Sequence, residues 1–133
     1  MSKKVHTSGK RKKATARATI YEGTGIIRIN SRLLDTVEPE LIRLKISEPL
    51  MLADEIAKKI NADIIIKGGG AMSQAEAARL ALAKGLVEYT GSKNLKKEFL
   101  SYDRHLLVAD VRRNEPHKPN DSKARAARQK SYR

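Results

Sequence analysis

The fold of this chain is decided by residues 64–76, which read Ile-Ile-Ile-Lys-Gly-Gly-Gly-Ala-Met-Ser-Gln-Ala-Glu. The three isoleucines at 64–66 are β-branched and apolar, which predicts a strand buried on both faces. Gly68, Gly69 and Gly70 end this strand, because glycine adopts positive φ angles freely and lets the backbone pass close to a neighbour. We therefore expect a structural glycine turn directly after the strand.

A long helix is predicted after this turn. Ser73 and Glu76 have the spacing of a capping box, in which each side chain bonds a free N–H of a new helix. The alanines of the helix and Gly85 allow close packing on a sheet, so the strand, turn and helix predict the core of one small α/β domain. Up to about Tyr89, small and apolar residues recur at steps of three and four and form one face: Ala71, Ala75, Ala78, Leu82 and Leu86.

A β-hairpin is predicted before this core. Residues 15–21 alternate between apolar and polar side chains, which indicates a half-buried strand. Residues 22–25 read as a turn, and 26–29 as the returning strand of the hairpin.

Three further helices are predicted. Pro39 and Pro49 each stand beside acidic residues, as in the first turn of a helix, so we expect two helices between residues 36 and 60. A shorter helix is predicted at 93–100.

Length and composition limit the class of protein. A chain of 133 residues is large enough for one domain with one core. Cysteine is absent, which excludes disulfides and thiolate metal sites and allows a reducing compartment. No apolar run approaches the roughly 20 residues of a membrane helix, and the lysine-rich start lacks the apolar segment of a signal peptide. We expect a soluble, intracellular protein with no membrane partner.

The net charge of +13 is concentrated at the two ends of the chain. Residues 1–17 have a charge balance of +7, and residues 112–133 a balance of +6. Residues 18–111 are neutral, with thirteen charges of each sign. This distribution predicts a folded platform with two extensions that bind a polyanion.

The C-terminal extension cannot pack a core of its own. Residues 112–133 contain no Val, Ile, Leu, Met or Phe, so they bury too little apolar surface to offset the entropy lost on ordering. Fully extended, this segment would reach roughly 70 Å, at about 3.3 Å per residue. We divide the chain into a basic N-terminal arm at 1–13, a globular domain at 14–110 and an extended basic tail at 111–133.

Motifs for catalysis are weak. Glycines 68–70 before a helix could hold a phosphate, but neither the P-loop nor the dinucleotide-binding pattern is present, so chain packing is the simpler explanation. His6, His105 and His117 lack metal-ligand spacing, and no serine elbow is present. The adjacent acids at 54–55 would point apart on a helix.

Three classes of function remain open on these observations. The first is a structural RNA-binding protein of a large ribonucleoprotein. The second is a free DNA- or RNA-associated regulator, which the aromatic content of only 4% disfavours because few rings are available to stack on bases. The third is a phosphate-handling enzyme built on the glycine turn.

A family resemblance decides among these classes. The chain resembles protein nine of the small ribosomal subunit from Gly9 to its end, and the Ser-Tyr-Arg ending is similar to the archaeal and eukaryotic branch. The residues that carry the resemblance are Lys67–Gly70, Gln74, Ala75, Ala78, Arg79, Leu82 and Lys84–Leu86, together with Gly9–Lys12 and Gln129–Arg133.

The resemblance implies a fold and a function. The fold would be an open sheet packed on helices with a left-handed β-α-β crossover, an exception to the usual hand. The protein would be a non-enzymatic constituent of the cytoplasmic ribosome, without a cofactor, and would bind small-subunit ribosomal RNA in the head, beside neighbouring head proteins. Its C-terminal tail would reach the anticodon stem-loop of the tRNA in the P site.

The resemblance also implies site residues, which are assigned by their positions in the sequence. The residues expected to bind ribosomal RNA are Lys10, Arg11, Lys12, Lys13, Arg17, Arg112, Arg113, Lys118, Lys123, Arg125 and Arg128. Those expected to contact the P-site tRNA are Lys130, Ser131, Tyr132 and Arg133. Relatives usually read Lys-Lys-Phe-Gly after Glu-Pro, whereas this chain has His-Lys-Pro-Asn-Asp at 117–121, which leaves the path of the tail open there.

Overall fold

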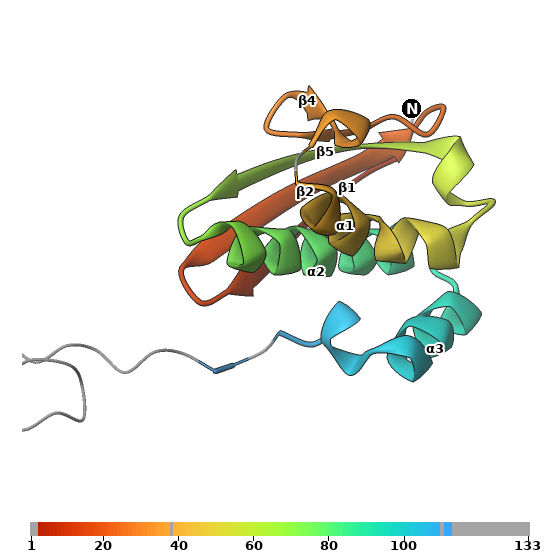
Figure 1. The fold of residues 1–133 in the computed structure, drawn as a ribbon. Helices are drawn as coiled ribbons and strands as arrows, with labels where there is room; N and C mark the ends of the chain where they lie inside the picture. Colours follow the sequence, from red (N-terminus) through yellow and green to blue (C-terminus); the bar gives the residue numbers. More distant parts are fainter. Residues whose placement is uncertain (1–2, 38, 110, 113–133) are drawn as a thin grey trace, which may run out of the picture.

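The computed structural model describes residues 3–37, 39–109 and 111–112 (Figure 1). Among the helices described, none combines the length and the apolar character that crossing a membrane requires. The elements follow one another as β1 Lys4–Arg11, β2 Ala14–Glu22, β3 Ile27–Ile29, β4 Arg32–Leu33, η1 Leu34–Thr36, α1 Glu40–Ala53, η2 Ala57–Lys59, β5 Ile60–Lys67, α2 Ala71–Thr90, α3 Lys93–Tyr102 and η3 Arg104–Leu106.

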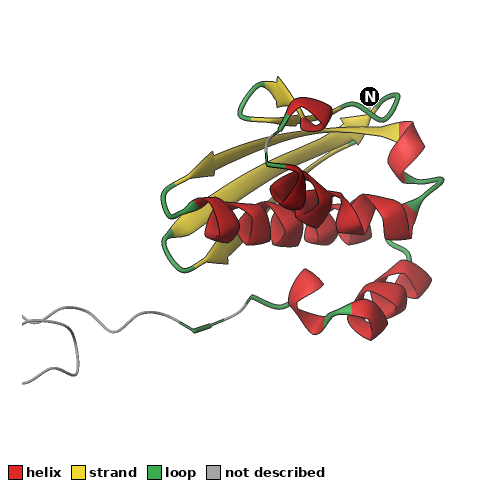
Figure 2. Ribbon diagram, in the orientation of Figure 1, coloured by secondary structure: helices red, strands yellow, loops and turns green. Residues whose placement is uncertain are grey.

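The strands form one open sheet in the order β1-β2-β5-β3-β4 (Figure 2). Neighbouring strands are antiparallel except for β3 and β5, which are parallel. The connection between these two strands runs through α1, so the sheet contains a β-α-β crossover. The mixed α/β fold and the single open sheet packed on helices are as predicted, and the left-handed sense of the crossover stays a prediction.

Both long helices, α1 and α2, lie on the same face of the sheet (Figure 1). Strand side chains alternate accordingly. In β2, Ala14, Ala16, Ala18 and Ile20 are buried beneath the helices, while Arg17 on the other face is exposed. The half-buried strand predicted at 15–21 is therefore confirmed, and we call the uncovered side the open face of the sheet.

Helix α2 packs unusually close to the sheet, as its small residues predicted. A Cβ atom on Gly85 would lie 2.3 Å from Cδ1 of Ile20, and one on Gly9 would lie 2.4 Å from the carbonyl oxygen of Ala77. At Gly9 the clash is with the helix backbone, so no side chain fits there, and at Gly85 the side chain of Ile20 would have to move. The helix ends at Thr90, close to its predicted end.

The strand at 64–66 is longer than predicted and is buried on one face only. Ile64 and Ile66 point into the core, but Ile65 is 56% exposed on the open face. The prediction of burial on both faces is wrong because the helices cover only one side of this sheet. Three consecutive isoleucines show no apolar–polar alternation in the sequence, so the pattern did not reveal that the middle one is exposed.

The predicted hairpin between β2 and β3 does not form, because β5 lies between these strands. The side chain of Asn61 in β5 explains the route of the chain. Its Oδ1 accepts hydrogen bonds from the backbone N–H groups of Thr24 and Ile26, at 2.9 and 3.0 Å. These bonds hold residues 24–26 across the start of β5 and lead the chain to its far side.

The two helices predicted between residues 36 and 60 are a single helix, α1, which continues through Pro49. Proline costs a backbone hydrogen bond inside a helix. Pro49 is nevertheless fully buried against the core, and this packing keeps α1 continuous where the proline and its acidic neighbour predicted the start of a second helix. The helix ends where Asp54 adopts a positive φ of 41°. The short helix predicted at 93–100 is confirmed as α3, with Phe99 fully buried.

The predicted capping box at the start of α2 is also wrong. Gly70 is the N-cap, and Ser73 lies inside the first turn without capping it. The helix begins at Ala71, directly after the glycine turn, whereas a cap at Ser73 would begin it at Gln74. Gln74 Nε2 donates instead to the carbonyl oxygen of Gly68 at 3.1 Å, and Glu76 pairs with Arg11 in β1.

Most of the segment expected as a free N-terminal arm is the edge strand β1. Val5 and Gly9 are buried against α2, and the hydroxyl of Thr7 donates to the carbonyl oxygen of Ala81 at 2.7 Å. The low apolar content of this segment was misleading, because β1 gains its stability from pairing with β2 and from a glycine that admits the helix.

Candidate RNA-binding surface

Basic side chains gather at one end of the open face. The strand register aligns Lys10 of β1 with Thr15 of β2 and with Lys67 of β5. Arg17 lies one row further along the open face, beside the exposed Ile65. Together with the exposed residues of the β1–β2 turn, they form a surface that we call the basic corner: Lys10, Lys12, Lys13, Arg17 and Lys67.

The glycine turn holds this corner in place. Gly68 and Gly69 have φ angles of 77° and 71°. A Cβ atom on Gly68 would lie 2.6 Å from the carbonyl oxygen of Lys13, and one on Gly69 would lie 2.9 Å from the backbone nitrogen of Ala14. Both positive φ and close approach thus require glycine here, which supports the chain-packing explanation of the turn over the phosphate-binding one.

The basic corner contains a shallow depression of about 480 Å³. It lies over the ends of β2 and β5, and no acidic side chain is among the described residues that line it: Lys13, Thr15, Arg17, Ile65, Lys67 and Gly68. Because these cations have no carboxylate beside them in the depression, the field there favours an anion. The lining cations can therefore bind the phosphates of a polyanion.

Arg11 differs from the other predicted arginines and lysines of this segment. Strand alternation turns it to the helix face of the sheet, where its side chain is only 13% exposed. Its Nε donates to Oε2 of Glu76 at 2.7 Å, and its Nη1 donates to the carbonyl oxygen of Arg112 at 3.2 Å. The structure therefore places Arg11 behind the basic corner, where it fastens the last described residues to β1.

Arg112 is exposed and lies at the start of the tail. It lines a small polar pocket with Lys10 and Arg11, so the tail leaves the body beside the basic corner. The other predicted site residues of the tail lie outside the described residues: Arg113, Lys118, Lys123, Arg125, Arg128, Lys130, Ser131, Tyr132 and Arg133.

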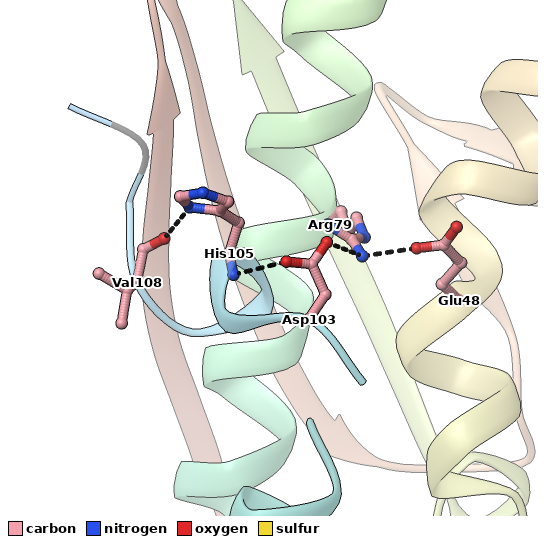
Figure 3. A network of polar contacts seen from close by, with 5 residues as sticks. All are labelled: Glu48, Arg79, Asp103, His105 and Val108. Carbon is pink, nitrogen blue, oxygen red and sulfur yellow. Dashed lines mark hydrogen bonds and ion pairs between the residues drawn. The ribbon is translucent and has the colours of Figure 1, made fainter. Parts of the chain in front are cut away.

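A buried ion-pair network fixes the segment that leads to Arg112 (Figure 3). Arg79 of α2 is 4% exposed, and its Nη2 lies 2.7 Å from Oε2 of Glu48 in α1 and 3.0 Å from Oδ2 of Asp103. The other carboxylate oxygen of Asp103 accepts from the backbone N–H of His105 at 2.9 Å. The ring of His105 in turn contacts the carbonyl oxygen of Val108 at 3.3 Å.

The charge of Asp103 is stabilised by this network. Burial raises the pKa of its carboxyl group, but the hydrogen bond from His105 and the hydrogen bond and charge of Arg79 together hold that pKa below its ordinary value. The carboxylate therefore stays ionised and joins α2 to the turn after α3.

The sequence contained a signal for this network. Arg79 is a lone cation on a helix whose neighbouring positions are alanine and leucine, and buried charges are nearly always paired. Its partners are 31 and 24 positions away in the chain, so periodicity alone could not identify them. Among the described residues there is no group of three or more His, Cys, Asp or Glu that could hold a metal.

Comparison with known proteins identifies the family of the chain. The family model described as Ribosomal protein S9/S16 matches residues 9–133. Proteins named Small ribosomal subunit protein uS9 from Methanococcus vannielii and from Methanococcus maripaludis are each 56% identical to the chain over 133 residues. These alignments cover 98% of this chain and 99% of each relative, and they fit the archaeal branch predicted from the Ser-Tyr-Arg ending. The chain therefore belongs to the ribosomal protein S9/S16 family.

Proposed function

We propose that this chain is a structural constituent of the small subunit of the cytoplasmic ribosome, and that it binds small-subunit ribosomal RNA in the head. Its family is one of ribosomal proteins and not of enzymes. The partners in this proposal are the ribosomal RNA, the neighbouring head proteins and the tRNA in the P site.

The observation that carries the proposal is the position of the basic corner relative to the start of the tail. Arg11 donates a hydrogen bond to the carbonyl oxygen of Arg112. In the sequence Arg11 stands between Lys10, which lies in β1, and Lys12, which lies in the following turn. Arg112, the last described residue, is thus held beside the cations of the basic corner. These cations can follow a folded RNA backbone, because phosphates repeat along it and bind lysine and arginine without regard to sequence.

In this proposal the body and the tail have different roles. The basic corner binds phosphates of ribosomal RNA from a rigid sheet. The tail residues Arg113, Lys118, Lys123, Arg125 and Arg128 extend the contact along the same RNA.

The last residues of the tail meet a second polyanion. Lys130, Ser131, Tyr132 and Arg133 stand at the far end of a segment long enough to leave the binding site of the body. The guanidinium of Arg133 can bind a phosphate with two parallel hydrogen bonds, which a lysine cannot do. We assign this contact to the anticodon stem-loop of the P-site tRNA.

The test compares small subunits assembled with the full chain and with a chain that lacks residues 131–133. We expect normal sedimentation and weaker retention of tRNA in the P site by filter binding over a range of magnesium concentrations. The variant Arg133→Lys is the matched control for charge, and it should give an intermediate loss because it keeps the charge without the bidentate geometry. Unchanged retention in the shortened chain would refute the tRNA contact, and an equal assembly defect would show that these residues act only in assembly.

A further inference from the structure

A groove lies on the side of the molecule formed by the β3–β4 hairpin, η1 and the second half of α1. It has a volume of about 530 Å³, and its apolar lining includes Ile26, Leu33, Leu50 and Met51. Figure 1 shows this hairpin and η1 at the edge of the sheet furthest from β1, beside α1. The groove therefore lies away from β1 and its contact with Arg112.

Large apolar side chains remain exposed around this groove. Met51 is 65% exposed, Leu33 47% and Ile26 39%. Leu44 stands two turns before Met51 on the same face of α1 and is exposed as well, with the polar Ser47 between them. Contiguous apolar surface of this kind, unlike single exposed residues, marks a site of protein interaction.

The charges at the groove disfavour RNA, the partner proposed for the basic corner. Asp35 and Asp54 line opposite sides, one in η1 and one at the end of α1. The one cation among the described lining residues is Lys58, and its ammonium lies 3.9 Å from Asp54 and 3.7 Å from Glu55. With Lys58 set against the two aspartates, the described lining keeps one net negative charge, which disfavours RNA phosphate and favours lysine or arginine.

We infer that this groove binds a short polypeptide segment of a second protein, in which apolar side chains alternate with lysine or arginine. The apolar side chains would enter between β4 and α1, and the cations would meet Asp35 and Asp54. The volume of the groove lies within the roughly 300–1,000 Å³ of pockets for small ligands. The groove can therefore accept a few side chains of a partner but not a whole domain. The inference rests on the proposed function only in expecting the second protein among the neighbours in the small subunit.

A pair of photo-crosslinking probes tests this inference. A benzoylphenylalanine replaces Met51 in one chain and Ile65 in another, because both side chains are exposed and neither supports the core. Each chain is assembled into small subunits from purified components and irradiated, and the products are separated into protein and RNA adducts. We expect the probe at 51 to yield one protein adduct whose linked peptide contains apolar residues and lysine or arginine, and the probe at 65 to yield RNA adducts.

A second variant tests the chemistry of the contact. Asp35→Asn combined with Leu33→Gln removes one charge and one apolar side chain from the rim without touching a buried residue. The yield of the protein adduct from position 51 should fall about tenfold, which corresponds to a loss of roughly 1.4 kcal/mol in binding. Circular dichroism and the RNA adduct from position 65 should stay unchanged.

The possible results separate this inference from the proposed function. An RNA adduct at position 51, no protein adduct there, or an adduct between two copies of this chain would overturn the inference and leave the RNA surface standing. A protein adduct at position 51 with the same yield in the presence and absence of the double substitution would also overturn it. If the probe at 65 gives no RNA adduct while the probe at 51 reacts as expected, the proposed RNA surface fails and the groove stands.

Discussion

Arg79 and Asp103 are joined by an ion pair of 3.0 Å, although one lies in the middle of α2 and the other after the end of α3. Glu48 of α1 completes the pair from the other side at 2.7 Å. A single buried guanidinium thus connects three helical segments, and it fixes the course of the chain toward the tail.

Replacing Arg79 by methionine should destabilise the fold by about 3 kcal/mol, because it leaves two partly buried carboxylates without a counter-charge. Urea unfolding followed by circular dichroism would measure the loss. Arg104→Met, an exposed arginine in η3, is the matched control and should change stability by less than about 0.5 kcal/mol. If Arg79→Met and its control unfold alike, the network contributes little to stability.

The ion pair also predicts a pH dependence. The pKa of Asp103 is lowered in the folded state, so its contribution to stability is fully present above its unfolded pKa. That contribution is lost as the pH falls from about 3.8, the ordinary value, through the lower folded value. Asp103→Asn should therefore be less stable than the parent at neutral pH, and the gap should narrow below about pH 3.8. Unfolding free energies measured across acid pH test this, and a constant gap would contradict it.

The glycine turn gives a prediction with an internal control. Gly69→Val should cost about 2–3 kcal/mol, because a β-branched residue is strained at a φ of 71° and its Cβ would meet the backbone of Ala14. At Gly70 φ is negative, and a Cβ there would meet no atom within 4 Å. Gly70→Ala should therefore unfold like the parent in a thermal melt. Equal melting temperatures for the Gly69 and Gly70 variants would show that the turn tolerates side chains.

Local patterns predicted those parts of the fold that depend on near neighbours. The strand at 15–21 and the alanine-rich helix to Tyr89 follow from periodicity, and the short helix at 93–100 was also predicted. The place of β5 between β2 and β3 rests on long-range contacts, among them the bonds of the Asn61 side chain to two backbone groups more than 30 positions away. No sequence pattern contains that information.

The sequence identified candidate site residues by type, but it did not show in which direction their side chains point. Lys10 and Arg11 are adjacent cations in the sequence, and both were expected to bind RNA. Strand pairing puts Lys10 on the open face and Arg11 on the helix face, against Glu76. The distinction required knowing that this segment is a strand, which its low apolar content concealed. Lys67 was noted only as part of the glycine signature, and its place in the corner comes from register with Thr15.

Salt dependence tests the basic corner. If Lys67 binds an RNA phosphate, Lys67→Ala should flatten the slope of log affinity against log salt by about 0.7–0.9. Lys59 is the matched control, because it is an exposed lysine immediately before β5, about 26 Å from Lys67 at the rise of a strand. Lys59→Ala should leave the slope unchanged. Equal slopes for both variants would place the RNA elsewhere on the protein.

The two arginines of this region, Arg11 and Arg17, allow the sharpest comparison between contact and positioning. Arg17 faces solvent on the open face, whereas Arg11 is held by Glu76 and by the carbonyl oxygen of Arg112. Arg17→Gln should weaken binding to ribosomal RNA and flatten the salt slope by about 0.7–0.9, as loss of one phosphate contact does. Arg11→Gln should leave the slope of the isolated protein unchanged.

The effect of Arg11→Gln should instead appear in the assembled subunit. Without the hydrogen bond to Arg112 the tail leaves the body in more directions, and its last residues meet the P-site tRNA less often. Filter binding should therefore show weaker tRNA retention for Arg11→Gln, together with normal sedimentation of the subunit. Arg11→Lys is the informative intermediate, because an ammonium restores the pair with Glu76 but lacks the second nitrogen that reaches Arg112. If Arg11→Gln flattens the salt slope as much as Arg17→Gln, Arg11 binds RNA directly and the positioning role is wrong.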